Sequence, residues 1–401
     1  MKSFIKCHFL DSGAFSLRRD VAAYRRAQAG SSVADYYHSP GFRQYIDGYA
    51  RFIKYYRRAV DYYANLDVIG YPELSWRNLR YLEEYHGLHP VPVIHARTDL
   101  RWLDRHLRRG YEFLAVGGLV GTSRHPEVIR WLDEFFHVVC PPPSGLPRVR
   151  LHAFGMTSGP LLFRYPFWSG DATNIGKLAM FGKIIVPYPH GDDYDYSRES
   201  RIIALSPRVR SHKFNINYPS IRPHKQRWVR NWLDHINNSH FFNRPLQYGE
   251  AVNDDCLAAN YFFYHHLCQH LPLWPYPFTA AARAPSLFDV PGSCQDRTLA
   301  PDRFHVFLSG SDMGRRARLV LAPLGIDGVE RMMTYYDCFT RKDGIDPELW
   351  EMYQERGGRR PRYTMPARPR NSTPKPKRDP RLDRWGKPCP IRRVCLWREP
   401  S

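Results

Sequence analysis

The chain of 401 residues contains no long apolar run and no paired-cysteine motif. A membrane-spanning helix needs roughly 18 or more consecutive apolar residues, so a membrane protein of this class is not indicated. The N-terminal sequence MKSFIKCHFLDSGAF lacks the apolar core and small-residue cleavage site of a secretory signal. None of the eight cysteines forms C-x-x-C, which argues against a zinc ribbon or a thioredoxin-type pair. We therefore expect a cytoplasmic protein with free thiols.

Acidic residues are scarce compared with basic ones. There are 39 Asp and Glu against 59 Lys and Arg, which gives a net charge of +20. Only 11 of the basic residues are lysine, so an arginine-rich genome is an alternative explanation for part of this excess. A surplus of this size favours a polyanionic partner, with nucleic acid ahead of an anionic membrane surface.

Composition divides the chain into four regions. Residues 1–190 are expected to form a catalytic barrel core, and residues 191–300 an irregular insertion, rich in Tyr, Pro and His, that contacts nucleic acid. Residues 301–355 would supply a barrel-closing strand and helices. Residues 356–401 hold 15 Lys and Arg, 3 Asp and Glu and 9 Pro, which predicts an extended basic tail. This tail is either an arm that binds phosphates or a solvated segment.

Short apolar runs alternate with amphipathic segments through the first 190 residues. The alternation predicts buried parallel strands separated by helices, and therefore an α/β (β/α)8 TIM-like barrel, incomplete or rearranged, with a large insertion and a basic C-terminal tail. The expected strands are Phe4–Leu10, Leu66–Ile69, Val91–His95, Phe113–Gly117, Val149–Phe154, Phe163–Trp168 and Lys183–Val186, with Phe304–Ser309 as the candidate eighth. The expected helices are Trp76–Tyr85, Asp99–Leu107, Glu127–Phe136 and Asp254–His270.

Three aspartates lie at or beside the ends of these expected strands. Asp11 follows the first strand, Asp67 belongs to the second, and Asp171 comes shortly after the sixth. Because the carboxyl ends of barrel strands meet at one face, residues far apart in the sequence would converge there. Taken singly, Asp11 and Asp171 could each be a helix N-cap, so the prediction depends on the set of three.

Histidine and glycine residues follow other strands and have equally plain alternatives. His95 and His152 could be core histidines with satisfied hydrogen bonds, and we favour that interpretation for His152. Gly117 and Gly118 could simply form a tight turn.

Six motifs give these residues a common interpretation. They are FLDSGAFS (Phe9–Ser16), NLDVIG (Asn65–Gly70), VPVIHA (Val91–Ala96), VGGLVG (Val116–Gly121), LHAFGM (Leu151–Met156) and YPFWSGDATN (Tyr165–Asn174). With these motifs, in this order, the sequence resembles the tRNA-guanine transglycosylase (queuine tRNA-ribosyltransferase) superfamily. Within it, the short DNA 7-deazaguanine transglycosylases encoded by phages are the most similar.

The resemblance implies an exchange of bases on a covalent intermediate. It implies that Asp171 is the nucleophile, that Asp11 is the general acid and base, and that Asp67 reads the purine edge. His95 stands where the tRNA enzymes carry a glutamine, and the rings of Phe15 and Phe154 would sandwich the base. The substrate-binding positions implied by the family are Asp67, Ser12, Phe15, His95, Gly117, Gly118, Leu119, Phe154 and Gly155.

The chemistry of the exchange fits these residue types. Breaking an N-glycosidic bond gives the sugar oxocarbenium character, which a carboxylate can stabilise and trap. The leaving guanine needs a proton, so a second carboxylate acts first as an acid and then as a base. A carboxylate can also accept hydrogen bonds from N1–H and the exocyclic amine of a guanine-like base.

Two further departures from the tRNA enzymes bear on the substrate. The sequence lacks their C-x-C-x-x-C zinc motif and the arginine segment after the nucleophile, which argues against tRNA as the substrate. The weak metal candidates are Cys256, His266, Cys268 and His270, and we favour a half-buried helix without zinc at these positions. We expect no required cofactor, and a structural zinc is an alternative that no motif supports.

Four hypotheses remain at this point. The leading one is exchange of guanine in double-stranded DNA for a 7-deazaguanine base such as 7-cyano-7-deazaguanine, with the target nucleoside flipped out of the duplex. The others are the same reaction on tRNA, a non-catalytic DNA-binding barrel, and a glycoside hydrolase. For a phage-encoded enzyme the compartment would be the host cytoplasm, and a homodimer is compatible with the superfamily.

Overall fold

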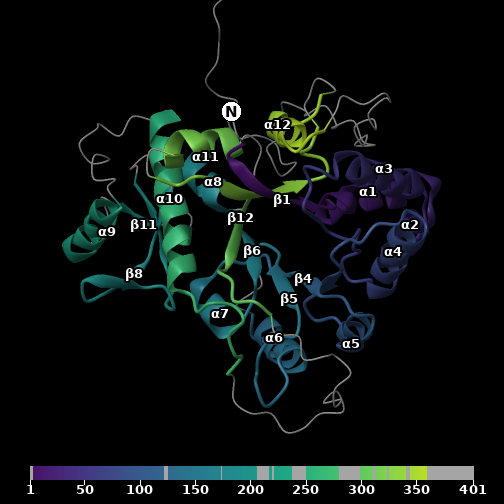
Figure 1. Ribbon diagram of the computed structural model, residues 1–401, viewed down its shortest axis with the longest axis horizontal. Helices are drawn as coiled ribbons and strands as arrows, with labels where there is room; N and C mark the ends of the chain where they lie inside the picture. The colour runs from purple at the N-terminus through teal and green to yellow at the C-terminus, as the bar shows by residue number, and fades with distance from the viewer. Residues whose placement is uncertain are drawn as a thin grey trace, which may run out of the picture.

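The computed structural model describes residues 3–121, 125–172, 174–205, 216–218, 221–236, 250–279, 299–309, 313–322, 325–339 and 344–358. Residues 359–401 of the expected tail and several stretches of the expected insertion lie outside these ranges. The described residues form a mixed α/β structure in which helices surround a curled parallel sheet (Figure 1). No helix within them combines the length and apolar character that crossing a bilayer requires.

Eight strands of the described chain form this sheet, and every neighbouring pair is parallel. Their order is β2-β1-β13-β12-β6-β5-β4-β3, so the strands follow one another around the curl in chain order. The strands are β1 (Ile5–Asp11), β2 (Tyr62–Tyr63), β3 (Val93–His95), β4 (Phe113–Gly117), β5 (Arg150–Ala153), β6 (Ser169–Ala172), β12 (His305–Ser309) and β13 (Val329–Thr334).

The two edges of the sheet meet just beyond β2 and just before β3. Ala64 and Val91 form a parallel bridge. The Asn65 amide donates to the Val91 carbonyl, and the Val91 amide donates to the Tyr63 carbonyl, both at 2.8 Å. The expected α/β architecture with parallel strands is confirmed, and this arrangement is compatible with a TIM-like fold.

Helices cover the outside of the sheet (Figure 1). Several begin at strong start signals: a capping box of Ser32 and Asp35 opens α2, and a proline stands in the first turn of α3, α4 and α6. The helices are α1 (Ala14–Ala27), α2 (Val33–His38), α3 (Pro40–Tyr56), α4 (Pro72–Glu84), α5 (Arg101–Arg108), α6 (Pro126–Val139), α7 (Gly159–Arg164), α8 (Asn174–Met180), α9 (Pro223–His235), α10 (Glu250–His270), α11 (Met313–Leu321) and α12 (Pro347–Glu355).

Two smaller sheets lie beside the main one. β7 (Lys183–Val186) pairs antiparallel with β10 (Arg201–Ala204), which pairs parallel with β11 (Ile216–Asn217). β8 (Tyr188–His190) and β9 (Asp193–Asp195) form an antiparallel ribbon. The side chain of Asn260 on α10 fixes β7, because its oxygen accepts from the Ile185 amide at 2.7 Å and its nitrogen donates to the Lys183 carbonyl at 3.0 Å.

Several expected elements are confirmed. The predicted strands Phe4–Leu10, Val91–His95, Phe113–Gly117, Val149–Phe154 and Phe304–Ser309 coincide with β1, β3, β4, β5 and β12, and the four predicted helices coincide with α4, α5, α6 and α10.

Three of the expected barrel strands are wrong. Leu66–Ile69 is a loop, because side chains rather than a neighbouring strand hold its backbone: the Val68 amide donates to Ser75 Oγ at 2.8 Å. Phe163–Trp168 straddles the end of α7, and the barrel strand begins only at Ser169. Lys183–Val186 is a strand, but it pairs antiparallel in the separate three-stranded sheet. β13, which joins β12 to β1, has no counterpart among the expected strands.

The inside of the curl is a compact apolar cluster to which most strands contribute. The Phe9 ring lies 4.8 Å from the His152 ring, 5.6 Å from Phe307 and 5.8 Å from Phe154, centroid to centroid. This aromatic packing lies directly below the carboxyl ends of β5 and β12. The buried members of the cluster are Phe9, Ala64, Val91, Val93, Ala115, Phe307 and Met332.

Candidate active site

The structure brings the three predicted aspartates together at the carboxyl ends of their strands. Asp11 is the last residue of β1, Asp171 lies in β6, and Asp67 follows the bridge after β2. The charges of Asp67 and of Asp171 both act on Asp11. Asp67 and Asp171 are 6% and 4% exposed, and Asp11 beside them is half-buried.

Asp11 is the carboxyl group whose protonation the site changes most clearly. Burial, followed by the charge of Asp67 and more weakly that of Asp171, raises the pKa of Asp11 to about 7. The Gly13 amide donates to Asp11 Oδ1 at 3.1 Å and acts in the opposite direction. Asp11 can therefore hold and release a proton near neutral pH, as a general acid and base must.

Asp67 is joined to His95 and Ser12. His95 Nε2 lies 2.9 Å from Asp67 Oδ2, and Ser12 Oγ donates to Asp67 Oδ1 at 3.4 Å. Gly117 makes room for the imidazole, because a Cβ at that position would lie 2.6 Å from His95 Cδ2. His95 is thus placed to orient the Asp67 carboxylate.

Donors on three different strands or loops surround the Asp171 carboxylate. The Gly155 amide donates to Oδ1, and Ser309 Oγ lies 3.5 Å from Oδ2 in hydrogen-bonding geometry. His152 Nε2 lies 3.6 Å from Oδ1. Because β5, β6 and β12 are neighbours, the main sheet itself fixes the position of this carboxylate.

His152 and Ser309 are site residues that sequence reasoning missed. His152 is fully buried, its Nδ1 lies 2.9 Å from Ser169 Oγ, and burial lowers its pKa. As expected for a core histidine, the Nδ1 side of the ring has a buried hydrogen-bond partner. The Nε2 side, however, faces Asp171. The signal for Ser309 was its place at the end of the predicted strand Phe304–Ser309.

The two predicted stacking residues differ in their surroundings. Phe154 is half-buried and packs edge-on against His152, with ring centroids 4.7 Å apart. Phe15, in the first turn of α1, is 72% exposed, and the Arg18 guanidinium lies 5.6 Å from its ring centroid. Phe154 thus belongs to the floor of the site, and Phe15 is available at its surface.

The glycine-rich turn after β4 approaches the loop after β5. Gly118 has a φ of 74°, and Gly155 has a φ of 65°. A Cβ on Gly155 would lie 2.3 Å from Val120 Cγ2, so only glycine allows the two loops this contact. The Leu119 side chain is buried in the core, which leaves only its backbone for contact with a base.

The metal candidates do not form a site in the described part of the chain. No group of three or more His, Cys, Asp or Glu residues there is arranged to hold a metal ion. Cys256 is fully buried and Cys268 half-buried in α10. His266 and His270 are stacked with ring centroids 6.4 Å apart, and burial together with His235 lowers the pKa of His266 to about 4.

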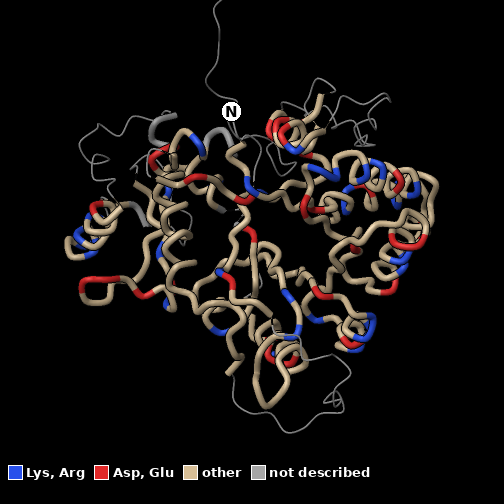
Figure 2. Tube along the Cα trace, in the orientation of Figure 1, with Lys and Arg blue, Asp and Glu red and all other residues tan. Residues whose placement is uncertain are grey.

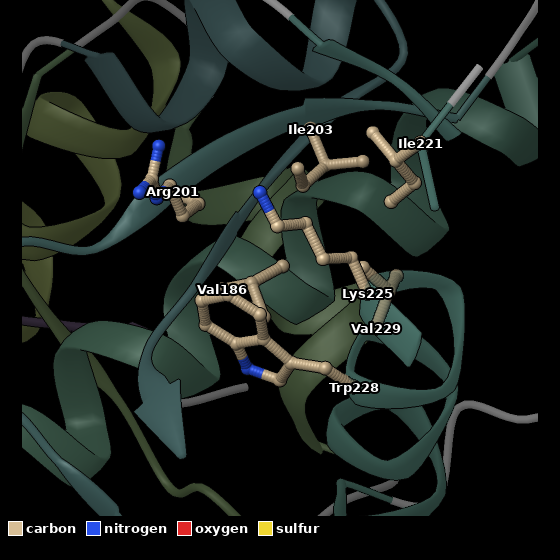
Figure 3. A pocket seen from close by; sticks show the side chains of 7 residues that line it. All are labelled: Val186, Arg201, Ile203, Ile221, Lys225, Trp228 and Val229. Atoms are coloured by element: carbon tan, nitrogen blue, oxygen red, sulfur yellow. The ribbon is translucent and has the colours of Figure 1, made fainter. Parts of the chain in front are cut away.

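A small pocket also lies between the three-stranded sheet and α9 (Figure 3). Trp228 stands at its side, and its indole Nε1 donates to the Pro187 carbonyl at 2.8 Å. None of the three aspartates contributes to it. Its lining consists of Val186, Arg201, Ile203, Ile221, Lys225, Trp228 and Val229.

Comparison with known proteins does not identify a family. No protein-family model matches the chain, and neither a curated protein nor a solved structure gives a match.

Proposed function

We propose that this protein is a DNA-guanine transglycosylase, which exchanges guanine in DNA for a 7-deazaguanine derivative such as 7-cyano-7-deazaguanine. The observation that carries the proposal is the single cluster of Asp11, Asp67 and Asp171 at the strand ends. We interpret the curled sheet as a (β/α)8 barrel, whose active sites lie at this face. The sequence motifs supply the reaction class.

The reaction begins with the transfer of the sugar from guanine to the enzyme. An oxygen of the Asp171 carboxylate bonds to C1′ of the target nucleoside as the bond from C1′ to the purine nitrogen breaks. Asp11 donates its proton to the departing base, so guanine leaves neutral. His152, Ser309 and the Gly155 amide keep Asp171 aimed during this step.

The second half of the reaction returns the sugar to a base. The incoming 7-deazaguanine gives its ring N–H proton to Asp11 and bonds to C1′, and the ester to Asp171 breaks. Both carboxyl groups are then restored to their starting states. A pKa near 7 for Asp11 suits this double role, because proton donation and proton acceptance are then nearly balanced.

Recognition of the base would depend on Asp67 and the turn after β4. Asp67 can accept from N1–H and the exocyclic amine, and His95 fixes the orientation of its carboxylate. Backbone amides near Gly118 can donate to O6. In duplex DNA these base edges are covered, so the nucleotide must be flipped into the site, and the net charge of +20 favours binding of the backbone.

The nucleophile is tested with Asp171→Asn. The variant should lose exchange of labelled guanine into DNA by roughly 10³-fold or more, because the amide cannot form the glycosyl ester. The covalent adduct with DNA, visible on a denaturing gel, should also disappear while DNA binding is retained.

Asp327→Asn is the matched control, since Asp327 is exposed and its carboxylate forms a surface ion pair with Lys6. Exchange by Asp171→Asn at the rate of this control would refute the assignment. A parallel assay with tRNA decides between the two nucleic acids.

A further inference from the structure

A second surface feature lies outside the candidate active site, between α4 and α5. It is a groove of about 670 Å³ whose walls are tryptophan and arginine side chains. Four arginines stand at positions i, i+4, i+7 and i+8 of one helical face, while the opposite face of α5 is buried. Figure 2 shows these basic residues recurring along α5. The groove is lined by Trp76, Arg101, Trp102, Asp104, Arg105, Arg108 and Arg109.

Two of the arginines are stacked on indole rings. The Arg105 guanidinium lies 4.9 Å from the ring centroids of both Trp76 and Trp102, and that of Arg109 lies 5.5 Å from Trp76. The Trp76 ring is itself supported by His106, at 5.2 Å. A stacked guanidinium uses its flat face and keeps its N–H edge available for a phosphate. Arg105 is stacked in this way on two rings, whereas Arg109 also forms a side-chain hydrogen bond with Tyr111.

The other two arginines form exposed ion pairs. Arg101 Nε lies 3.3 Å from Asp99, and Arg108 Nε lies 2.8 Å from Asp104. The two arginine side chains are 69% and 65% exposed, so these pairs contribute little and can exchange for a phosphate.

The fold places the start of α5, at Arg101, on the side of the sheet where the candidate active site lies. α5 follows β3, whose last residue is His95, and in a parallel α/β fold the helix begins at the face where the strand ends. From Arg101 to Arg109 the helix rises by roughly 12 Å, at about 1.5 Å per residue. That length matches about three nucleotide steps along a duplex.

We propose that the groove formed by Trp76 and the arginines of α5 binds the phosphate backbone of the DNA that presents its base to the site. The proposal rests on the proposed function only for the identity of the anion as DNA. The competing explanation is that the arginines serve only to join α5 to α4.

The test is the salt dependence of binding to a short fluorescent DNA duplex, measured by anisotropy. Arg105→Gln/Arg109→Gln should bind more weakly, and the slope of log K against log salt should fall by about 2, since each lost phosphate contact removes about 0.9. Arg105→Lys/Arg109→Lys should restore most of the slope because the charge is kept. Arg101→Gln/Arg108→Gln leaves the stacked pair intact, and it should also weaken binding and lower the salt slope.

The matched control is Arg25→Gln/Arg26→Gln, which removes the same charge from the last turn of α1. If the salt slope of the control falls as much as that of the α5 variants, total charge alone matters and the proposal is overturned. An unchanged slope in the α5 variants would also overturn it. The exchange assay separates the two proposals. If the α5 variants lose slope but wild-type protein shows no exchange, the groove stands and the transglycosylase does not. If wild-type protein does not bind DNA, both fall.

Discussion

Asp11 is held in a protonation state that an exposed aspartate does not adopt at neutral pH. Its neighbours Asp67 and Asp171 carry the same sign of charge, and partial burial disfavours the ionised form of the group. Carboxyl groups that lie in different environments can take opposite roles in one reaction. The arrangement costs stability, since ionised Asp11 is unfavourable in the folded state.

This cost gives a test that does not depend on activity. The pKa of Asp11 rises from its ordinary value of 3.8 to about 7, so its contribution to stability is complete below about pH 4 and is lost as the pH rises through 7. The side chain of Asp11→Asn stays neutral at every pH. Near pH 8 the free energy of unfolding of this variant, measured with urea, should exceed that of wild type by up to about 4 kcal/mol. Near pH 4 the two should be similar. A difference independent of pH would contradict the burial of Asp11, and the variant should also lose exchange.

At the scale of single residues, the contacts that orient Asp171 were not predictable from the sequence. Asp171 itself lies in a motif, but Ser309 lies far along the chain and reaches it only because β12 pairs with β6. His152 was predicted as a core residue because nothing in the local sequence shows that its ring spans from Ser169 to Asp171.

At the scale of elements, apolar runs located five of the eight strands of the main sheet. β6 (Ser169–Ala172) was missed because it has no apolar run: Gly170 is needed where a Cβ would lie 2.8 Å from the Met156 carbonyl. β13 was missed because Glu330 and Arg331 interrupt it. Arg331 is nevertheless fully buried, with its Nη1 2.9 Å from Asp346 and 2.7 Å from Glu348. A charged residue buried by its partners defeats a rule based on hydrophobic pattern.

An ion-pair cluster joins β12 to β13 and gives the prediction at this scale. His305 Nδ1 lies 2.6 Å from Glu330, and its Nε2 lies 2.9 Å from Asp302. Although burial lowers it, hydrogen bonds and the charges of Glu330 and Asp302 together raise the pKa of His305 to about 9. The stabilisation is complete below about pH 6.5 and is lost as the pH rises through 9.

His305→Gln should therefore be less stable than wild type by about 1–2 kcal/mol near pH 6, a figure reduced for the exposure of Asp302. The difference should shrink towards zero near pH 10, as measured by urea unfolding. A constant difference would mean that the charge on His305 contributes nothing. This pH window lies above that of Asp11, so the two effects can be separated.

At the scale of the whole molecule, the curled sheet joins its first strand in the sequence to its last. β1 pairs with β13, and the opposite edges meet at the bridge between Ala64 and Val91. The candidate site consequently includes Asp11 near one end of the chain and Ser309 near the other. Sequence reasoning placed Asp11 correctly at the end of its strand, but the strands that it expected beside Asp67 and Asp171 were wrong, and it could not derive how the edges of the sheet meet.

Positive charge is distributed unevenly over the same molecule. Residues 356–401 carry 15 Lys and Arg and 3 Asp and Glu, more than half of the net charge. Within that range, Arg356 belongs to the fold: its guanidinium lies 2.7 Å from Asp61 and donates to the Lys6 carbonyl at 3.0 Å. A truncation after Gly358 keeps this anchor and removes most of the basic segment.

Removal of residues 359–401 should separate DNA binding from chemistry. Affinity for duplex DNA and its salt slope should both fall, because fewer counterions are released on binding. Thermal stability should be nearly unchanged, and exchange at saturating DNA should proceed at the wild-type rate, because Asp11, Asp67 and Asp171 remain in place. A truncated protein with the full salt slope would show that the folded part alone supplies the phosphate contacts. A truncated protein that binds fully but has lost exchange would instead place part of the site in the removed segment.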